Sequence, residues 1–246
     1  MTDFEQIRKL KTILETTQRI TVFTGAGTST ESGVKDYRSA DGIYNACTQY
    51  GMRPEDILHH DSLSQCPDIF WDFIRTYFLT AAEPNAFHFW LKELEKEGKL
   101  LAVITQNVDD LFEQVGLHNV IHIHGTAQQY YCMNCAKRYT KGDILQMKDT
   151  VPRCKDCGVM IRPRICLYGE CPEEDAAQSA IDAIETADTL IVAGTSLRVY
   201  PAASYLRFFG GENLVIFNRE ETDYDARATL AMHDSIGEIL NALKTV

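Results

Sequence analysis

The sequence predicts an α/β fold in which helices cover both faces of a parallel sheet and a smaller module is attached. Five short apolar runs rich in β-branched residues are typical of buried strands, and they end at Thr24, Thr105, Ile123, Gly194 and Asn218. Helical patterns separate most of these runs, which favours parallel strands joined by helices. Two further segments interrupt the alternation and predict the smaller module.

Helices are predicted around the strands from apolar residues at helical spacing. The chain opens with such a pattern, made by Phe4, Ile7, Leu10, Ile13 and Leu14. The stretch AFHFWLKELEKEG precedes the second strand, and EEDAAQSAIDAIETA precedes the fourth. After the last strand, DSIGEILNALKTV places four apolar residues on one helix face, which are Ile236, Ile239, Leu240 and Leu243.

The two interrupting segments differ from each other in composition. Residues from about 37 to 84 are helical and aromatic, with no clear strand pattern. Residues from about 126 to 164 carry paired cysteines among polar and basic residues. We expect both segments to be insertions that form the second module together.

Composition limits the classes of partner. The chain has 246 residues, of which 45% are hydrophobic, and a formal net charge of −11. An acidic surface repels phosphate, which argues against general binding to nucleic acid or to anionic membranes and is compatible with basic partners. The first residues lack the apolar core of a signal peptide, and no run approaches the roughly 18 apolar residues of a membrane span. We therefore expect a soluble cytoplasmic protein, and no pattern indicates its oligomeric state.

Four of the eight cysteines form two C-x-x-C pairs, separated by eighteen residues. Two such pairs at this distance are typical of a structural zinc site with four thiolate ligands, and the predicted ligands are Cys132, Cys135, Cys154 and Cys157. Redox chemistry is the alternative interpretation of these pairs. The remaining cysteines lack partner spacing, and we expect them to be ordinary residues.

A glycine-rich stretch, GAGTSTESG, follows the first predicted strand. Gly25 and Gly27 let a backbone approach a pyrophosphate closely, and a helix N-terminus after such a loop favours negative charge. Thr28 and Ser29 add hydroxyl donors, whereas Thr30 stands where a dinucleotide fingerprint has its third glycine. A tight turn between a strand and a helix is the alternative explanation.

Polar residues also follow the second and third predicted strands. Gln106, Asn107 and Asp109 suit the recognition of a carboxamide, although Asn107 or Asp109 capping the next helix explains them equally well. In IHIHG, His122 and His124 alternate with isoleucines, so we expect both imidazoles on one side of the strand. A structural histidine is the common case, but a neutral imidazole at a strand end suits a general base.

All five predicted strands end in polar or glycine residues or are directly followed by them. GTSLRVYPAA follows the fourth strand, and Asn218 ends the fifth. Because the carboxyl ends of parallel strands meet at one edge of a sheet, these residues predict a shared ligand crevice.

In chain order, GAGTSTESGVKDYRSADGIY, TQNVDDL, HIHG, the two C-x-x-C pairs, RPRICLYGE, GTSLRVYPAA and VIFNREE resemble the sirtuins, a family of NAD-dependent protein-lysine deacylases. The resemblance covers about residues 20 to 235. It implies a Rossmann-like NAD-binding domain made of residues 1–36, 86–125 and 165–246. It also implies a small domain made of a helical insertion, residues 37–85, and a zinc-ribbon insertion, residues 126–164.

The resemblance assigns two sets of binding residues. It implies NAD contacts at Gly25, Ala26, Gly27, Thr28, Ser29, Asp36, Tyr37, Arg38, Gln106, Asn107, Asp109, His124, Gly194, Thr195, Ser196, Asn218, Arg219, Glu220 and Ser235. It implies pairing with an extended acyl-lysine peptide at Cys166, Leu167, Tyr168, Gly169, Glu170, Leu197, Arg198 and Val199. Asn107, Asp109 and His124 would be the catalytic residues.

The implied reaction begins when the acyl-lysine oxygen attacks C1′ of the nicotinamide ribose and nicotinamide leaves. His124 then accepts a proton from a ribose hydroxyl, and the oxygen of that hydroxyl attacks the imidate carbon. Water completes the release of lysine and O-acyl-ADP-ribose. A protein ADP-ribosyltransferase with the same pocket and a non-catalytic NAD-sensing zinc-ribbon adaptor are the alternatives.

The chain departs from the family pattern near the predicted peptide segments. Arg164, Cys166 and Arg198 replace neutral or β-branched residues of many relatives, which affects the expected choice of peptide or acyl group. Ile74 and Tyr77 occupy the positions of the Tyr-x-x-Arg pair of the desuccinylase branch. We therefore expect short neutral acyl groups, chiefly acetyl.

Overall fold

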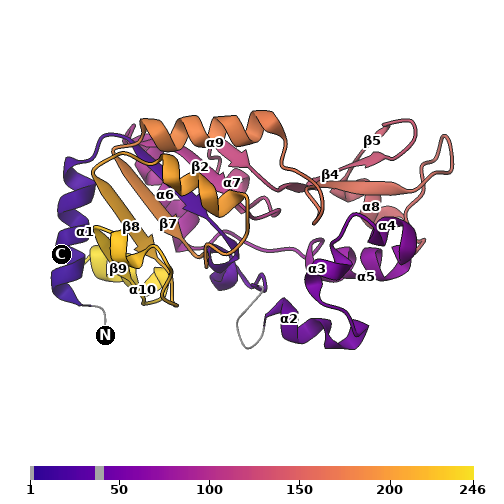
Figure 1. The fold of residues 1–246 in the computed structure, drawn as a ribbon, viewed down its shortest axis with the longest axis horizontal. Helices are drawn as coiled ribbons and strands as arrows, with labels where there is room; N and C mark the ends of the chain where they lie inside the picture. Colours follow the sequence, from indigo (N-terminus) through magenta and orange to yellow (C-terminus); the bar gives the residue numbers. More distant parts are fainter. Residues whose placement is uncertain (1–2, 37–41) are drawn as a thin grey trace.

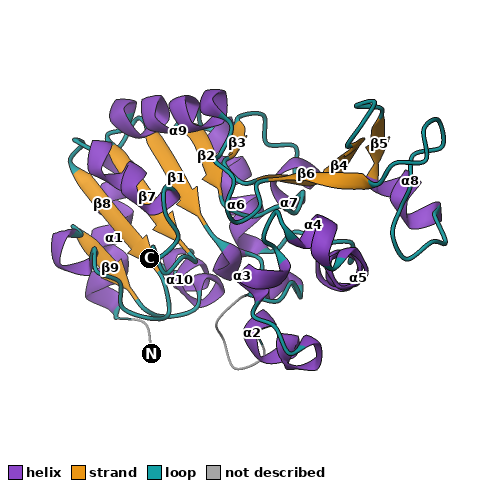
Figure 2. Ribbon diagram, turned by 45° about the vertical axis from the view of Figure 1, so that its right-hand side comes forward, coloured by secondary structure: helices purple, strands orange, loops and turns teal. Residues whose placement is uncertain are grey.

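The computed structural model describes residues 3–36 and 42–246, and its centre is a six-stranded sheet. The strands are β1 (Ile20–Thr24), β2 (Leu100–Thr105), β3 (Val120–His122), β7 (Thr189–Ala193), β8 (Asn213–Phe217) and β9 (Leu230–Met232). They lie in the order β3-β2-β1-β7-β8-β9, and every neighbouring pair is parallel (Figure 2). The predicted parallel sheet is confirmed, and β9 is an additional strand that the sequence analysis missed.

Alternating side chains explain why these runs form strands with both faces buried. Val22 and Ile191 point into one core cluster, whereas Phe23 and Val192 point into another on the opposite face. All four side chains are fully buried. A strand buried on both faces is apolar throughout, which is the pattern of the five predicted runs.

Helices cover the two faces of the sheet (Figure 1). One face carries α1 (Phe4–Thr16), α6 (Ala86–Lys96), α7 (Leu111–Gln114) and α10 (Ile236–Leu243). The other carries α9 (Glu174–Thr186) and the 3-10 helix η4 (Ala202–Phe208). The helices predicted from periodicity are therefore confirmed, and they bury the apolar stripes that predicted them.

A second, antiparallel sheet extends away from the first (Figure 1). Its strands are β4 (Gly125–Cys132), β5 (Arg138–Thr140) and β6 (Ile161–Ile165), in the order β5-β4-β6. Short helices pack beside it, which are α2 (Ile43–Ala46), α3 (Pro54–Ile57), α4 (Ser62–Gln65), α5 (Pro67–Tyr77), α8 (Lys141–Gln146) and the 3-10 helix η3 (Cys47–Tyr50). The sequence analysis did not predict these three strands.

A third core cluster joins the two segments that interrupt the alternation. Trp71 and Tyr130 are its largest fully buried side chains, and their rings stack at 6.0 Å between centroids. One belongs to the helical segment and the other to the cysteine-bearing segment, so each segment buries apolar surface that it cannot cover alone. Among the described residues, no helix has the length and apolar character needed to cross a membrane.

Candidate active site

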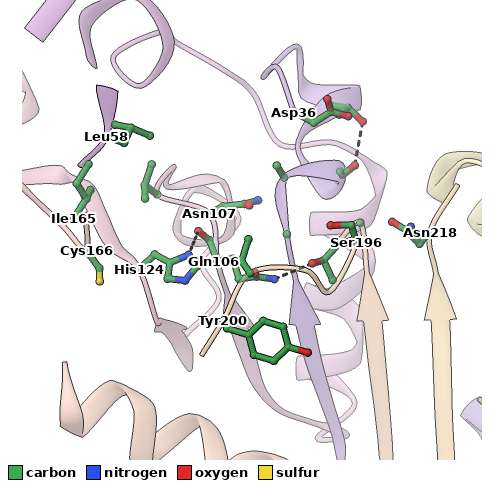
Figure 3. Close-up of a pocket in the computed structure, with 18 of the residues that line it drawn as sticks. Asp36, Leu58, Gln106, Asn107, His124, Ile165, Cys166, Ser196, Tyr200 and Asn218 are labelled. Atoms are coloured by element: carbon green, nitrogen blue, oxygen red, sulfur yellow. Dashed lines mark hydrogen bonds between the residues drawn. The ribbon is translucent and has the colours of Figure 1, made fainter. Parts of the chain in front are cut away.

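A cavity of about 350 Å³ opens at the carboxyl edge of the six-stranded sheet (Figure 3). Its walls come from the loops after β1, β2, β7 and β8, from the turn between β3 and β4, and from the segment after β6. Nineteen of the predicted site residues line it: Gly25, Ala26, Gly27, Asp36, Gln106, Asn107, His124, Cys166, Leu167, Tyr168, Gly169, Glu170, Gly194, Thr195, Ser196, Val199, Asn218, Arg219 and Glu220. Tyr37 and Arg38 lie outside the described residues.

The glycines of the first loop let it pack directly against the loop after β7. A Cβ atom at Gly27 would lie 2.7 Å from the Cα atom of Gly194, and one at Gly25 would lie 2.7 Å from the Cβ atom of Thr195. Gly194 adopts a φ of +60°, a left-handed conformation that favours glycine. The two loops also share a hydrogen bond of 2.8 Å, which the Gly27 N–H donates to the Gly194 carbonyl oxygen. The two strand ends therefore form one continuous floor for a ligand.

The expectation of a helix directly after the glycine loop was wrong. The loop continues as two 3-10 turns, η1 (Ala26–Thr28) and η2 (Thr30–Ser32). Thr28 and Ser29 are buried and do not line the large cavity, since the Thr28 hydroxyl donates to the Gly25 carbonyl oxygen at 2.9 Å. These hydroxyls therefore hold the loop together from behind, and the cavity presents backbone at this point.

Asn107, Ser29 and Asp109 form a hydrogen-bonded chain behind the floor. The Asn107 amide donates to the Ser29 hydroxyl at 3.0 Å, and that hydroxyl donates to the Asp109 carboxylate at 2.9 Å. Burial raises the pKa of Asp109, although its hydrogen bond from Ser29 opposes this shift. Asp109 lines a smaller cavity of about 80 Å³, which shares Gln106 and Asn107 with the large one.

The structure also supports the alternative that Asp109 caps the helix α7. The backbone N–H of Leu111, the first residue of α7, donates to the Asp109 carboxylate at 3.3 Å. Asp109 thus supports the start of α7 and the loop after β1 at once.

Gln106 connects three parts of the site. Its side-chain amide donates to the Thr24 carbonyl oxygen at 3.1 Å and to the Thr195 hydroxyl at 3.0 Å. Its own backbone carbonyl oxygen lies 3.1 Å from Nδ1 of His124 (Figure 3). The loop after β2 is therefore anchored to the end of β1, to the loop after β7 and to the imidazole.

The contact with Gln106 determines which nitrogen of His124 is basic. A carbonyl oxygen only accepts hydrogen bonds, so Nδ1 of His124 carries the proton and Nε2 keeps a lone pair. Burial lowers the pKa of His124, and the hydrogen bond to Gln106 opposes the shift only in part. The imidazole is therefore neutral near pH 7 and is available as a proton acceptor.

The two histidines of IHIHG differ in their surroundings. The strand β3 ends at His122, so His124 lies in the turn that follows. Nε2 of His122 contacts the Glu113 carboxylate, and this residue does not line the cavity. Burial lowers the pKa of His122, but Glu113 outweighs that effect and the net pKa is raised. The pKa values of the two imidazoles are therefore shifted in opposite directions, and the two rings also differ in position.

Three other predicted site residues do not line the cavity. Leu197 is buried in the core under η4, with a φ of +56°, and Arg198 is exposed. Ser235 caps α10, because its hydroxyl accepts from the Glu238 N–H at 3.3 Å and donates to the Glu238 carboxylate at 2.7 Å. This hydroxyl is engaged within its own helix end.

Hydrogen bonds and an ion pair connect the segment of residues 166–170 to three other parts of the chain. The Cys166 N–H donates to the His124 carbonyl oxygen at 2.9 Å, and the Tyr168 N–H donates to the Leu58 carbonyl oxygen at 3.0 Å. Arg162 binds the Glu170 carboxylate through two nitrogens, at 2.6 Å and 2.9 Å. Burial alone would lower the pKa of Arg162, yet Glu170 raises it overall. These contacts fix the backbone of the segment beside the imidazole.

Apolar side chains that the sequence analysis missed line the same cavity as His124. Leu58, Phe78, Val108 and Ile165 all line the cavity, and Leu58 and Ile165 are visible beside His124 (Figure 3). They come from four separate segments, so no local pattern marks them. Tyr200, which is 70% exposed, lines the cavity near the loop after β7.

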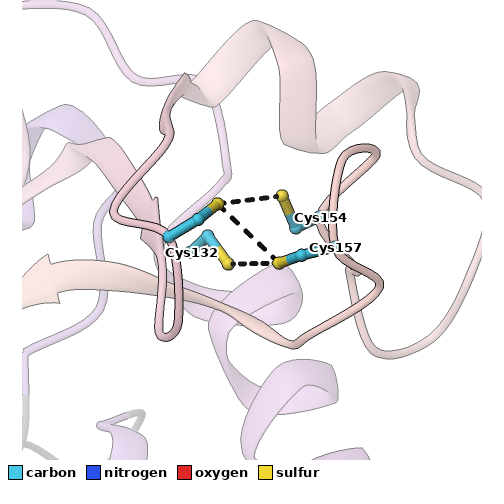
Figure 4. A group of neighbouring side chains, drawn as sticks. Cys132, Cys154 and Cys157 are labelled. Carbon is cyan, nitrogen blue, oxygen red and sulfur yellow. Dashed lines mark hydrogen bonds between the residues drawn. The ribbon is translucent and has the colours of Figure 1, made fainter.

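The four paired cysteines meet at the far end of the antiparallel sheet (Figure 4). The Cys132 and Cys157 sulfurs are 3.3 Å apart, and the Cys135 sulfur lies 3.6 Å from that of Cys154 and 3.7 Å from that of Cys157. Four thiolates around one zinc ion at about 2.3 Å would be separated by about 3.8 Å, whereas a disulfide needs about 2.05 Å. The cluster therefore fits a closed four-thiolate zinc site, as predicted.

Known proteins are similar to this chain over nearly its whole length. Residues 25–201 match the model of the Sir2 family. An NAD-dependent protein deacetylase of Staphylococcus aureus is 41% identical over 240 residues, which covers 97% of this chain and 98% of the relative. One of Clostridium acetobutylicum is 39% identical over 240 residues, with the same coverage of 97% and 98%.

Solved structures are similar in fold. A Sir2 structure with deacetylated p53 peptide and 3′-O-acetyl ADP ribose has a TM-score of 0.90 at 35% identity, and 97% of each chain is covered. A structure of Sir2Tm bound to a propionylated peptide has a TM-score of 0.84 at 34% identity, covering 97% of this chain and 96% of the other.

Proposed function

This chain belongs to the Sir2 family and is an NAD-dependent protein deacetylase, and on that premise we propose that the cavity at the sheet edge brings NAD and an acyl-lysine together around His124. The observation that carries the proposal is the state of His124. This neutral imidazole has its proton fixed on Nδ1 by Gln106 and lines the same cavity as the glycine loop and the segment of residues 166–170. A non-catalytic NAD sensor has no need of such a base.

The residues of the cavity fit NAD. When bound, NAD supplies a ribose carbon that becomes electrophilic as its bond to nicotinamide breaks. The backbone of the loop at Gly25 and Gly27 faces the ligand without side chains, as close approach to a pyrophosphate requires. Gln106 and Asn107 line the part of the cavity where we place the nicotinamide half of NAD. Asn218 lines the part where we place the adenosine half.

Three roles in the chemistry fall to residues of this chain. Nε2 of His124 would accept the proton of a ribose hydroxyl, while Nδ1 stays bonded to Gln106. Asn107 and Asp109 would hold the nicotinamide end, because their own chain of hydrogen bonds through Ser29 fixes their orientation. The apolar wall beside His124 would exclude water until the acyl oxygen has reacted.

We propose that the substrate peptide binds as an added strand between residues 166–170 and residues 197–199. The first of these segments is anchored by Arg162 and Leu58 and lines the cavity, which gives an added strand a fixed template. Solved Sir2 structures with p53, acetylated and propionylated peptides are among the similar proteins, which supports a peptide as the substrate.

The apolar side chains that line the cavity also bear on which acyl group the protein accepts. Ile74 is fully buried in the third core cluster, and the guanidinium of Arg75 donates to the carbonyl oxygens of Met147 and Asp149. With Leu58 and Phe78 lining the cavity near His124, this end favours neutral acyl groups such as acetyl and propionyl. A succinyl carboxylate would lose its hydration there.

The zinc site and the domain division complete the proposal. The thiolates of Cys132, Cys135, Cys154 and Cys157 would hold zinc as a structural ion, far from the reacting atoms. We propose that the predicted division into an NAD-binding domain and a small domain is correct, and the separate third core cluster supports it. The cytoplasmic location stays a prediction.

The test is incubation of the protein with NAD and matched peptides that carry acetyl, propionyl, butyryl, succinyl or unmodified lysine, with products read by mass. We expect nicotinamide and O-acyl-ADP-ribose with the acetyl and propionyl peptides, and no nicotinamide release with unmodified lysine. Steady NAD hydrolysis without an acyl peptide, or ADP-ribose covalently attached to protein, would contradict the proposed function.

A further inference from the structure

Residues 59–61 gather metal-ligand atoms outside the cavity and away from the four cysteines. One ligand atom each of His59, His60 and Asp61 lies within 4.8 Å of the others. The three residues connect α3 to α4 at the inner end of the small module (Figure 1). Their side chains are 38%, 42% and 55% exposed, so an ion can reach them from solvent.

The spacing of the two imidazoles suits a shared ion. Their Nδ1 atoms are 3.4 Å apart, and the Asp61 carboxylate lies 3.4 Å from Nδ1 of His59. Two nitrogens that each bind zinc at about 2.1 Å and lie this far apart subtend an angle of about 108°, which is close to tetrahedral. The cluster therefore places two imidazole nitrogens at a spacing compatible with one shared ion, with a carboxylate beside them.

The cluster is tied directly to the segment proposed to bind the peptide. The His60 N–H donates to the Tyr168 carbonyl oxygen at 3.0 Å, and the Tyr168 N–H donates to the Leu58 carbonyl oxygen at 3.0 Å. A Cβ atom at Gly169 would lie 2.9 Å from Nε2 of His59. The residues of the cluster are therefore bonded to and packed against the segment whose backbone lines the cavity.

We propose that His59, His60 and Asp61 form a second metal site, for a divalent transition-metal ion, that restrains the segment of residues 166–170 and strengthens peptide binding when occupied. Nitrogen and oxygen ligands favour ions such as Ni²⁺, Co²⁺ and Zn²⁺ over Ca²⁺ or Mg²⁺. The site itself is independent of the reaction, whereas its effect on peptide binding rests on the proposed function.

The first experiment measures binding without activity. Zinc-loaded protein without a histidine tag is titrated with NiCl₂ in a calorimeter, beside the variants His60→Gln and His59→Gln/His60→Gln. We expect one Ni²⁺ per wild-type chain and an affinity at least about tenfold lower in either variant. Equal Ni²⁺ binding by wild type and the double variant would overturn the site.

The matched control is His118→Gln. His118 is 84% exposed and lies 3.2 Å from the Glu95 carboxylate, so it is a histidine–carboxylate pair without a second imidazole. We expect this variant to bind Ni²⁺ as the wild type does. Loss of the bound Ni²⁺ in this variant alone would place the ion elsewhere and refute the proposal.

The second experiment tests the coupling. Deacetylation rates are measured against acetyl-peptide concentration with and without saturating Ni²⁺. In the wild type, we expect the metal to lower KM for the peptide by at least about threefold with a smaller change in kcat, because a segment already held in place loses less freedom when the peptide binds. His59 and His60 do not line the cavity, so we expect the double variant to keep its activity. We also expect its peptide KM not to change when Ni²⁺ is added. Stoichiometric Ni²⁺ binding with an unchanged peptide KM would overturn the coupling between the metal site and peptide binding. Inactivity of the wild type and of all variants in the absence of Ni²⁺ would instead count against the proposed function.

Discussion

At the scale of single residues, the chemistry depends on which atom of His124 faces the cavity. The Gln106 carbonyl oxygen holds Nδ1, and burial keeps the ring neutral, so Nε2 is the available base. The neighbouring His122 has the opposite character, because Glu113 raises its pKa. Two histidines of one short motif thus differ in role through their surroundings alone.

The first prediction concerns the base itself. We expect His124→Ala to lower kcat for deacetylation by about 10² to 10⁴-fold, the usual contribution of a general base, and to leave NAD binding detectable. Product formation by mass and NAD binding by calorimetry measure the two effects. The control is His122→Gln, which we expect to retain activity because His122 does not line the cavity. Equal losses in the two variants would point to a structural role for His124.

The second prediction concerns pH. His124 must be neutral to accept a proton, and its pKa lies below the ordinary value of 6.5 because it is buried. Activity should therefore persist below pH 6.5 and fall as the pH drops through the lowered pKa. The pH dependence of kcat/KM measures this acidic limb, which we expect to be absent from the residual activity of His124→Ala. A wild-type midpoint above 6.5 would contradict the assignment.

At the scale of elements, the ends of β1 and β7 work as one unit. Gly25 and Gly27 pack against Gly194 and Thr195 at distances that leave no room for a Cβ atom. The turns after Gly25 are 3-10 rather than α-helical, so the loop stays close to the sheet edge. The missing third glycine, at Thr30, is consistent with this different backbone path.

The third prediction tests this packing. We expect Gly27→Ala to raise KM for NAD and to lower the free energy of unfolding by about 1–3 kcal/mol, because its Cβ atom would meet the Cα atom of Gly194 at 2.7 Å. Chemical denaturation and initial rates against NAD concentration measure the two changes. Gly210→Ala serves as the control, since a Cβ atom there meets nothing within 4 Å. Equal behaviour of the two variants would show that the loops are not tightly coupled.

At the scale of the whole molecule, the small module supports one wall of the cavity. Its core cluster contains Tyr130 and Leu167, and Leu167 also lines the cavity. The four cysteines lie at the other end of the same antiparallel sheet (Figures 1 and 4). Zinc therefore acts on the reaction only through the fold of this module.

The fourth prediction concerns that dependence. We expect Cys154→Ser to lower the zinc content, to make the small module sensitive to proteolysis and to reduce activity together with peptide binding. Metal analysis, limited proteolysis and the peptide KM report these effects. The control is Cys171→Ser, an exposed cysteine outside the cluster. A soluble, metal-free and fully active Cys154→Ser protein would refute a structural role for zinc.

Sequence and structure contributed different parts of this picture. The sequence by itself determined the parallel sheet, its covering helices, the four-cysteine cluster and the convergence of the strand ends, because these depend on local periodicity and short spacings. It missed β9 and the antiparallel strands, which are short or partly exposed and so lack a continuous apolar run.

Only the tertiary structure decided which side chains share the cavity. It brought Leu58, Phe78, Val108 and Ile165 to His124 from four separate segments. It also turned Ser235 to its own helix end and selected Nε2 of His124 as the free nitrogen. Such outcomes depend on distances between residues far apart in the chain, and those distances exist only once the sheet and the small module have packed.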